Sequence, residues 1–585
     1  MDCRESGNRR TQERSRRRHV PVLVGLLGLA CLVQVVVIRR ATVTALDAVR
    51  FVRIARAVDE QGLLPTIRAE REQPLFPVWV WVVHRSLRGT LGEFDSSWAT
   101  SAQLAAAIAV VLAVVPVYLL VLRLVGSAAA LAGSLFFCLL PEVSRLGADG
   151  ISDSTHLLFF CVAFWAMVES MRSPPVDAGA EPGAGRSYAW LWLLCAGVAT
   201  GVAALARVEV LVLATTLVLT LIWFQCRPRR RQPWKRLAVA LSSFAAGSVI
   251  VLGPYLVSVG ALTPQAAAGR LLSRGHPEWS AGERDGVDAD LDDVSQLAGG
   301  ESLSFDVKES SLSSRQRGYA GAVVRFGRKL AGAFGYWIGA LAVFGVWRLR
   351  GRRATAADRF VQVFFLAFTL TAIWFTAAEG YLVSRHLLVL VVAGVGAAGY
   401  GALELGSCLR RTSRTSLSRP ETAYSLLAWC VVGLAGAGCV FRTTVRLHHN
   451  HLGHRAAGHW LAQQAAVPGA VLDTRGWSGL YSGRKTYAYD QARSALRDPR
   501  LAYLVLESRE LGFESARSRT LCRLIDLAAR PAAEFPELAV RAANQRPVVV
   551  YRWYPDRFEG RMATRVADSG KQGGSDVGRN SGVRR

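Results

Sequence analysis

Apolar runs long enough to cross a bilayer recur along most of this sequence. A transmembrane helix needs about 20 mostly apolar residues, and a chain with many such runs is not expected to fold as a soluble globule. The runs lie near residues 20–38, 99–122, 127–142, 154–171, 188–206, 209–225, 237–258, 332–347, 360–377, 386–404 and 423–441. We therefore predict a mainly α-helical, polytopic membrane protein with about eleven transmembrane helices.

The composition agrees with this prediction and excludes other classes of protein. Of the 585 residues, 51% are hydrophobic and only 19% are charged, which excludes a disordered chain. The formal net charge is nevertheless +26. The basic residues gather beside the apolar runs without interleaved aromatic residues or a helical basic stripe, so nucleic acid is not an expected partner.

The basic clusters predict the orientation in the membrane. They lie at residues 4–18, 227–236, 348–353 and 410–419. The positive-inside rule places such clusters in the cytoplasm, so we expect a multi-pass cell-membrane protein with a cytoplasmic N-terminus and an uncleaved first helix. The main outer loops are then residues 39–98, 143–153, 259–331 and 378–385. Segment 74–88 is too short for a span, and we interpret it as an interfacial or re-entrant helix.

The chain is predicted to have four parts. These are a basic cytoplasmic tail (1–19), a transmembrane domain (20–441), an extracytoplasmic domain (442–560) and a disordered tail (561–585). In the third part, a helical pattern near 455–466 precedes short β-branched runs at 469–473, 501–507 and 547–553. Alternation of helices and strands predicts a small α/β domain.

Ionisable residues near the outer ends of the runs are candidates for chemistry, because charge is costly there. Asp47 follows the first run and lies three residues before Arg50, on the same face of any helix there. A solvated ion pair and a catalytic carboxylate both fit this position. Arg207 and Glu209 separate two runs and would form a polar, ion-paired turn.

A second acidic segment precedes the fourth run. Arg145, Asp149 and Asp153 recur every four residues and would share one helix face unless Gly150 ends the helix. Asp153 also suits the role of a helix N-cap. Arg385 and His386 open a late run. Arg385 has the guanidinium fork that binds phosphate, although an arginine here can also simply reach toward lipid headgroups.

Several of these residues resemble one known family. The acidic start of the first outer loop (Asp47-Ala48-Val49-Arg50), its Gly62-Leu63 turn and the sequence Glu72-Gln73-Pro74-Leu75-Phe76-Pro77 are similar to the first outer loop of the GT-C membrane glycosyltransferases. The nearest branch is that of the protein-O-mannosyltransferases and aminoarabinose transferases. Family members often have Asp-Glu where this chain has Asp47-Ala48, and Lys-Pro-Pro where it has Glu72-Gln73-Pro74.

The resemblance implies a GT-C-like fold and transfer of a sugar from a polyprenyl-phosphate donor to an acceptor at the outer membrane face. It implies Asp47 as catalytic base and Asp153 as the second acidic residue. Arg385, Arg207 and Arg56 are the expected ligands of the donor phosphate. The expected supporting residues are Arg145, Asp149, Glu209 and His386. The extra arginines of the outer loop (Arg50, Arg53, Arg56, Arg68 and Arg71) are expected to favour the same phosphate.

The alternative is a transporter or flippase of a lipid-linked or anionic substrate. A transporter is expected to carry ionisable residues near the middle of its spans, whereas these gather at the outer ends. The enzyme is therefore favoured.

A metal cofactor is not indicated. Among the histidines at 448, 449, 451, 454 and 459, only His451 with His454, and more loosely His454 with His459, approach the spacing of metal ligands on a helix. No carboxylate completes the set in the sequence, and the ten cysteines contain no CxxC pair. We interpret the histidines as part of a polar linker.

Overall fold

The computed structural model describes residues 2–561 except 71, 92–95, 173–187, 227–233, 260–317, 381, 413–419, 465–466, 513–515, 536–546 and 559. The predicted disordered tail lies outside the described residues apart from Arg561. The chain forms two compact units. The membrane unit comprises residues 1–87, 100–264 and 312–447, and the C-terminal unit comprises residues 88–99, 265–311 and 448–585.

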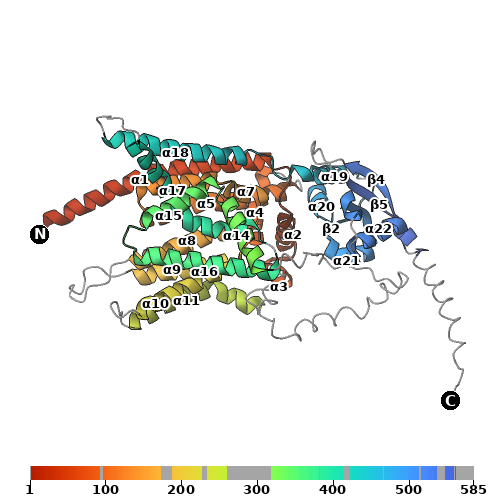
Figure 1. Ribbon diagram of the computed structural model, residues 1–585. Coiled ribbons are helices and arrows are strands. Elements are labelled where there is room, and N and C mark those ends of the chain that lie inside the picture. Colours follow the sequence, from red (N-terminus) through yellow and green to blue (C-terminus); the bar gives the residue numbers. More distant parts are fainter. Residues whose placement is uncertain are drawn as a thin grey trace, which may run out of the picture. The chain divides into compact units, whose positions relative to one another are not determined.

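The membrane unit is a bundle of helices (Figure 1). They are α1 (Asp2–Arg40), α2 (Leu46–Gln61), α3 (Leu63–Ala69), α4 (Leu75–Leu91), α5 (Ser96–Leu124), α6 (Ser127–Leu139), α7 (Pro141–Asp149), α8 (Asp153–Arg172), α9 (Ala189–Ala204), α10 (Leu211–Cys226), α11 (Trp234–Val259), α14 (Tyr319–Ala333), α15 (Trp337–Leu349), α16 (Ala356–Glu379), α17 (Leu388–Thr412) and α18 (Pro420–Thr443). Among the described residues, eight helices can cross a membrane by length and composition, and two bent helix pairs raise the number to ten. The shorter apolar helix α9 matches the remaining predicted run. The predicted polytopic α-helical fold is confirmed.

One predicted boundary is wrong. Residues 319–331, expected in an outer loop, belong to α14, which meets α15 at a bend of 100°. Gly335 and Tyr336 at this bend have positive φ angles of 67° and 60°. Helix α14 carries Arg325 and Lys329 among its apolar residues. Such charges lower the average hydropathy and hide an amphipathic helix from a search for uniformly apolar runs.

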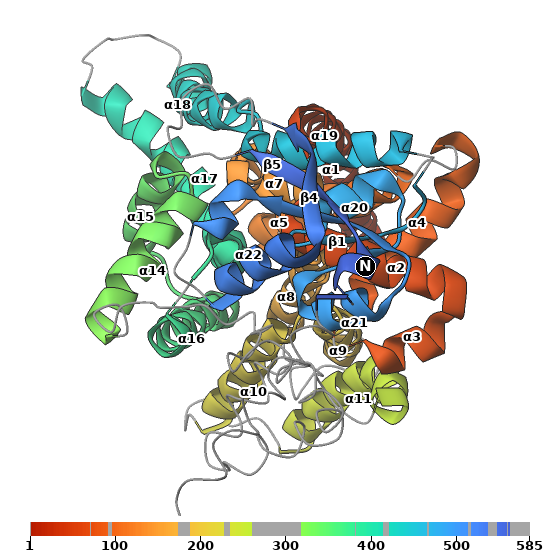
Figure 2. The same ribbon diagram turned by 90° about the vertical axis from the view of Figure 1, so that its right-hand side faces the viewer.

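Small residues allow the helices to approach one another closely. Gly345 of α15 and Gly401 of α17 face each other, and a Cβ atom added at Gly401 would lie 2.1 Å from the carbonyl oxygen of Leu341. Lipid is as apolar as a leucine side chain, so helices in a bilayer associate through such close backbone contacts. In Figure 2, which looks along the helices, α9 and α11 lie side by side, and a Cβ atom added at Gly197 of α9 would lie 2.1 Å from the carbonyl oxygen of Phe244 of α11.

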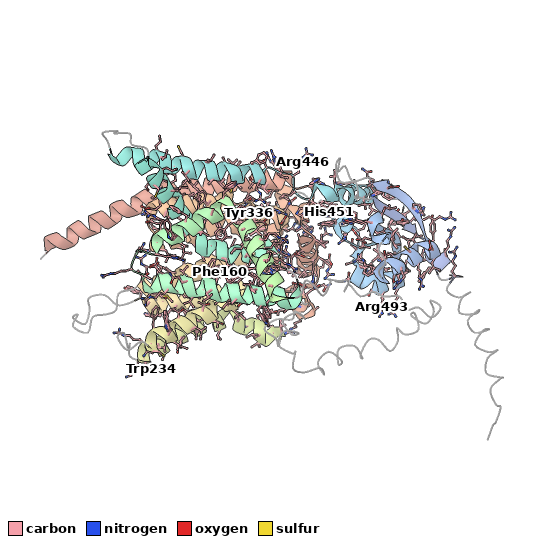
Figure 3. The ribbon with its side chains drawn as sticks, viewed as in Figure 1. Phe160, Trp234, Tyr336, Arg446, His451 and Arg493 are labelled. Carbon is pink, nitrogen blue, oxygen red and sulfur yellow. The ribbon has the colours of Figure 1, made fainter. Side chains whose placement is uncertain are left out.

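Aromatic side chains fill the contact between α8 and α16. Phe160 and Phe164 of α8 meet Phe360 and Phe364 of α16, with ring centroids between 5.1 and 5.6 Å apart. All four rings are buried. Figure 3 shows Phe160 in the interior of the bundle. These contacts hold the start of α8 at a fixed distance from α16.

The C-terminal unit is an α/β fold built on a five-stranded sheet in the order β2-β1-β3-β5-β4. Its strands are β1 (Ala470–Asp473), β2 (Thr486–Tyr487), β3 (Leu501–Glu507), β4 (Ala529–Phe535) and β5 (Val548–Trp553). Its main helices are α19 (Leu452–Gln463), α20 (Trp477–Ser482), α21 (Ala492–Arg497) and α22 (Ala516–Ala528). Strand β1 is parallel to β2 and β3, whereas β5 is antiparallel to β3 and β4.

The three predicted strands correspond to β1, β3 and β5. Strand β4 was not predicted from the sequence. It contains Arg530 and Pro531, and most of its residues are exposed or half-buried, so it lacks the apolar run of a buried strand.

At the end of β3, Glu507 is a buried carboxylate. Burial alone would raise the pKa of Glu507, but hydrogen bonds with His451 and His454 and nearby positive charge hold it well below its usual range.

The contact between α15 and α17 gives a prediction about stability. Gly401→Ala is expected to lower the stability of the protein by about 1–3 kcal/mol, because the added Cβ overpacks a closed backbone contact. Gly433→Ala on α18 is the matched control, since a Cβ there meets nothing within 4 Å. Thermal unfolding in detergent measures both variants. A melting temperature of Gly401→Ala equal to that of the control would contradict the observed packing.

Candidate functional site

Four segments of the membrane unit meet at one end of the bundle. They are the start of α2, the start of α8, the turn containing the 3-10 helix η1 (Val208–Val210), and the 3-10 helix η5 (Ser384–Leu387) before α17. Helix α2 lies across this end of the bundle (Figure 1). These segments carry six of the predicted site residues, namely Asp47, Asp153, Arg207, Glu209, Arg385 and His386.

Arg385 joins the first outer loop to α8. Its Nη2 atom donates a hydrogen bond of 2.5 Å to Oδ2 of Asp47, across 338 residues of sequence. Its Nε atom lies 3.8 Å from Oδ2 of Asp153. The side chain of Asp47 is 48% exposed and that of Asp153 only 8%. Asp47 is thus accessible to a second molecule, whereas Asp153 is enclosed.

Arg207 extends this contact into a row of charges. Its Nη1 atom donates to Oδ1 of Asp153, while Nη2 and Nε donate to Oε1 of Glu209 at 2.8 and 3.0 Å. The two oxygens of Asp153 therefore face different arginines. We call the side chains of Asp47, Arg385, Asp153, Arg207 and Glu209, in this order of contact, the charge row. Its three carboxylates outnumber its two guanidinium groups.

Backbone hydrogen bonds fix both ends of the first outer loop beside the charge row. Ala45 lies two residues before Asp47, and its amide donates to the carbonyl oxygen of Asp149 at 3.0 Å. At the other end of the loop, the amide of Leu75 at the start of α4 donates to the carbonyl oxygen of Leu205 at 3.1 Å. Leu205 lies two residues before Arg207. Asp149, predicted as a supporting residue, thus contacts the loop through its backbone.

Of the two alternatives for the segment from Arg145 to Asp153, the structure shows the one in which Gly150 ends the helix. Gly150 ends α7 in the left-handed conformation, with a φ angle of 67°, and α8 begins only at Asp153. Glycine adopts this conformation without the steric cost of a side chain. Arg145 remains on α7, where its Nη1 atom lies 4.0 Å from Oε1 of Glu142. The carboxylate of Asp153 is directed at two arginines.

The charge row borders a pocket with one apolar wall. The lining residues are Asp153, His156, Leu157, Arg207, Glu209, Phe368, Arg385, His386, Leu388 and Val389. His386 was predicted as a supporting residue, and the structure places it in the lining. His156 is buried, with Nδ1 3.4 Å from the carbonyl oxygen of Ala203. Phe368 has no distinguishing signal in the sequence, because it is one apolar residue among many in α16.

Cationic, acidic and apolar groups converge in this pocket. Guanidinium groups bind phosphate oxygens through paired, charge-assisted hydrogen bonds. Leu157, Phe368 and Val389 add apolar side chains to the same lining. The exposed Asp47 can accept a proton from a group bound nearby. The arrangement therefore fits an amphipathic phosphate ester and a second reactant.

The outer-loop arginines have other partners. Arg50 forms an ion pair with Glu72 at 2.6 Å, and Arg53 lies 3.4 Å from Glu70. Arg68 donates to the carbonyl oxygen of Ser258. These contacts give Arg50, Arg53 and Arg68 partners within the chain, and the expected contact of this loop with a ligand phosphate stays a prediction. Arg71 lies outside the described residues, and Arg56, on α2, is not among the residues that line the pocket.

One protein family matches part of the chain that carries this site. The family model for dolichyl-phosphate-mannose-protein mannosyltransferase matches residues 72–251. The match includes Asp153, Arg207 and Glu209, whereas Asp47 and Arg385 lie on either side of it. No curated protein matches the chain.

Solved structures match almost the whole chain. ArnT from Cupriavidus metallidurans in the apo state aligns with a TM-score of 0.56 and 15% identity over 92% of this chain and 99% of that chain. The same enzyme bound to undecaprenyl phosphate gives 0.56 and 14% over 90% and 97%. The archaeal oligosaccharyltransferase AglB from Archaeoglobus fulgidus, in complex with an inhibitory peptide and a dolichol-phosphate, gives 0.50 and 13% over 93% and 77%. The likeness shows a common fold.

The charge row gives a prediction about folding. Arg207→Gln leaves Asp153 enclosed with one fewer cation, and loss of one partner of a buried ion pair costs about 3–5 kcal/mol. We expect a lower melting temperature in detergent for this variant. In the double variant Arg207→Gln/Asp153→Asn, removal of the uncompensated charge is expected to restore part of the loss. Additive losses from the two substitutions would contradict a direct coupling between these side chains.

Proposed function

We propose that this chain is a member of the GT-C superfamily of membrane glycosyltransferases and transfers a sugar from a polyprenyl-phosphate donor to an acceptor at the outer face of the membrane. One observation carries the proposal: Arg385 joins Asp47 to Asp153 beside a pocket with an apolar wall. A guanidinium group next to an accessible carboxylate supports a phosphate site beside a general base. The bound undecaprenyl phosphate and dolichol-phosphate of two structural neighbours support the donor class.

The donor phosphate binds Arg385 and Arg207. The polyprenyl tail enters sideways from the lipid along Leu157, Phe368 and Val389, while the phosphate lies at the end of the bundle. Arg385 can exchange its exposed partner Asp47 for the phosphate and still keep its contact with the enclosed Asp153. The two guanidinium groups then stabilise the charge that develops on the departing phosphate.

Asp47 is the general base. It accepts the proton of the acceptor hydroxyl or amine as that group attacks the anomeric carbon. A bond forms between the acceptor atom and the anomeric carbon, and the bond from that carbon to the phosphate oxygen breaks. Attack from the face opposite the phosphate inverts the anomeric configuration, and polyprenyl phosphate leaves. Binding of the donor to Arg385 also releases Asp47 from its ion pair, so that its carboxylate can turn toward the acceptor.

Asp153, Glu209 and His386 position these groups. Asp153 holds Arg385 and Arg207 at a fixed separation through its two oxygens, and Glu209 orients Arg207 from the other side. Arg56 has no part in this mechanism. The basic clusters support an orientation with this end of the bundle outside, and the location of the charge row at helix ends favours an enzyme over a transporter.

Asp47→Asn tests the base. We expect the rate of sugar transfer to fall by at least about 100-fold, because a general base contributes about 10²–10⁴ to the rate. The assay measures the loss of radiolabelled sugar from a panel of polyprenyl-phosphate sugars in proteoliposomes, with membrane extract as the acceptor source. Asp59→Asn on the same helix is the control, since an amide oxygen can still accept the hydrogen bond from Trp81.

Two outcomes would contradict this proposal. Wild-type activity in Asp47→Asn would remove the proposed base. Movement of the labelled donor across the membrane without cleavage of the sugar–phosphate bond would establish a flippase instead.

Arg385→Gln tests donor binding separately from chemistry. A hydrogen bond to a charged group contributes about 1.5–3 kcal/mol, so loss of the guanidinium is expected to weaken binding of undecaprenyl phosphate at least about tenfold. Arg385→Lys keeps the charge but not the fork and is expected to restore binding only partly. Binding is measured by ligand-dependent thermal stabilisation in nanodiscs, with Arg68→Gln as the control. Equal affinities in wild type and Arg385→Gln would exclude this phosphate site.

A further inference from the structure

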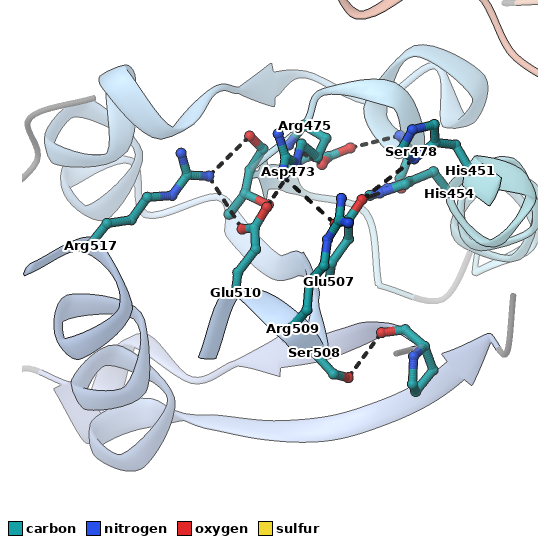
Figure 4. Close-up of polar contacts among 12 residues, drawn as sticks. His451, His454, Asp473, Arg475, Ser478, Glu507, Ser508, Arg509, Glu510 and Arg517 are labelled. Carbon is teal, nitrogen blue, oxygen red and sulfur yellow. Dashed lines mark hydrogen bonds and ion pairs between the residues drawn. The ribbon is translucent and has the colours of Figure 1, made fainter. Parts of the chain in front are cut away.

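Two histidines and a carboxylate converge within the C-terminal unit (Figure 4). His451 precedes α19, His454 lies in its first turn, and Glu507 ends β3. Oε1 of Glu507 lies 3.2 Å from Nε2 of His454 and 3.5 Å from Nδ1 of His451. All three atoms lie within 4.8 Å of one another. Glu507 supplies the carboxylate that is missing from the sequence around the histidines. The interpretation of His451 and His454 as part of a polar linker is therefore corrected.

The distances fit a tetrahedral metal site. Zinc binds imidazole nitrogen and carboxylate oxygen at about 2.0–2.2 Å, so neighbouring ligand atoms lie about 3.3–3.5 Å apart in a tetrahedron. Two of the three separations already have this length. The third separation, between the two histidines, is at most 4.8 Å. The side chain of His451 is 16% exposed, whereas those of His454 and Glu507 are almost fully buried.

Surrounding groups orient the three side chains. Nδ1 of His454 lies 3.3 Å from the hydroxyl of Ser478, which leaves Nε2 directed at Glu507. The carboxylate of Asp473 in turn accepts a hydrogen bond of 2.6 Å from the amide of Ser478. Such second contacts fix the tautomer and ring orientation of metal-binding histidines. The other oxygen of Glu507 is occupied by Arg509.

An indole ring packs against both histidines. The ring centroid of Trp477 lies 4.4 Å from that of His451 and 5.2 Å from that of His454. Arg475 contacts Glu507 and also Glu510, with Nε of Arg475 2.8 Å from Oε1 of Glu510. Both arginines contact Oε2 of Glu507, whereas the two histidines contact Oε1.

We propose that His451, His454 and Glu507 bind one divalent transition-metal ion of the zinc class, through Nδ1, Nε2 and Oε1 respectively. A water molecule completes the tetrahedron. The ion joins the first turn of α19 to the end of β3 and so stabilises the C-terminal unit. This site is separate from the charge row and does not depend on the proposed glycosyltransferase activity.

Zinc binding by the purified full-length protein tests this proposal. The protein in detergent is stripped with a chelator, the chelator is removed, and Zn²⁺ is titrated while bound metal is measured by mass spectrometry and melting temperature is followed. Wild type is expected to bind one equivalent of Zn²⁺. His451→Ala is expected to bind Zn²⁺ at least about tenfold more weakly, since loss of one ligand bond weakens a three-residue site. His449→Ala and His459→Ala, with exposed side chains, are the controls and are expected to match wild type.

Cobalt adds a readout of geometry. Co²⁺ in the site is expected to give the intense visible absorption of tetrahedral coordination in wild type and in both controls, but not in His451→Ala. Glu507→Gln, which keeps the side-chain volume, is expected to lose the same signal. Equal zinc content and equal cobalt spectra in wild type, His451→Ala and Glu507→Gln would overturn the proposal. A wild-type protein that retains no zinc would show that the three side chains form a hydrogen-bonded network only.

Discussion

The pairing of Asp153 with two arginines is the constraint on which the membrane unit depends. A carboxylate that is 8% exposed at the end of an apolar bundle is stable only with compensating charge. Its partners come from η1 and η5, far apart in the sequence, so the bundle must bring both segments to the start of α8. Glycine contacts such as Gly345–Gly401 let the helices approach, but apolar surfaces tolerate small shifts. The charge row specifies one arrangement.

The same pairing assigns different roles to two similar carboxylates. Asp47 and Asp153 both contact Arg385, yet one is 48% exposed and the other 8%. On the proposed mechanism, an incoming phosphate competes with both carboxylates for the guanidinium group of Arg385, and it displaces the carboxylate that water can solvate most readily. Asp47 therefore leaves and Asp153 stays. On the proposed mechanism, exposure alone decides which acid becomes the base and which remains a structural anchor.

The sequence indicated which charged residues are candidates for the site, but not most of the ion pairs that they form. Asp47, Asp153, Arg207, Glu209 and Arg385 were recognisable because each interrupts apolar sequence, where a charge needs a reason. The pair of Arg207 and Glu209 was predicted, whereas the contact of Arg385 with Asp47 was not, because a contact across 338 residues leaves no local pattern. Family resemblance supplied the expected roles, but not the partners of Arg50 and Arg53, which are glutamates of the same loop. Helix α14 was missed because its charges mask its apolar face.

The histidine–glutamate group shows why spacing alone fails for sites at sheet edges. His451 and His454 lack a nearby carboxylate in sequence, since Glu507 arrives at the end of β3 after the chain has formed β1 and β2. Strands β1 and β3 are parallel neighbours, so their carboxyl ends bring Asp473 and Glu507 to one edge. This is where open α/β sheets usually bind ligands. The topology therefore places acidic side chains beside the start of α19, and the two histidines need only be there to meet them.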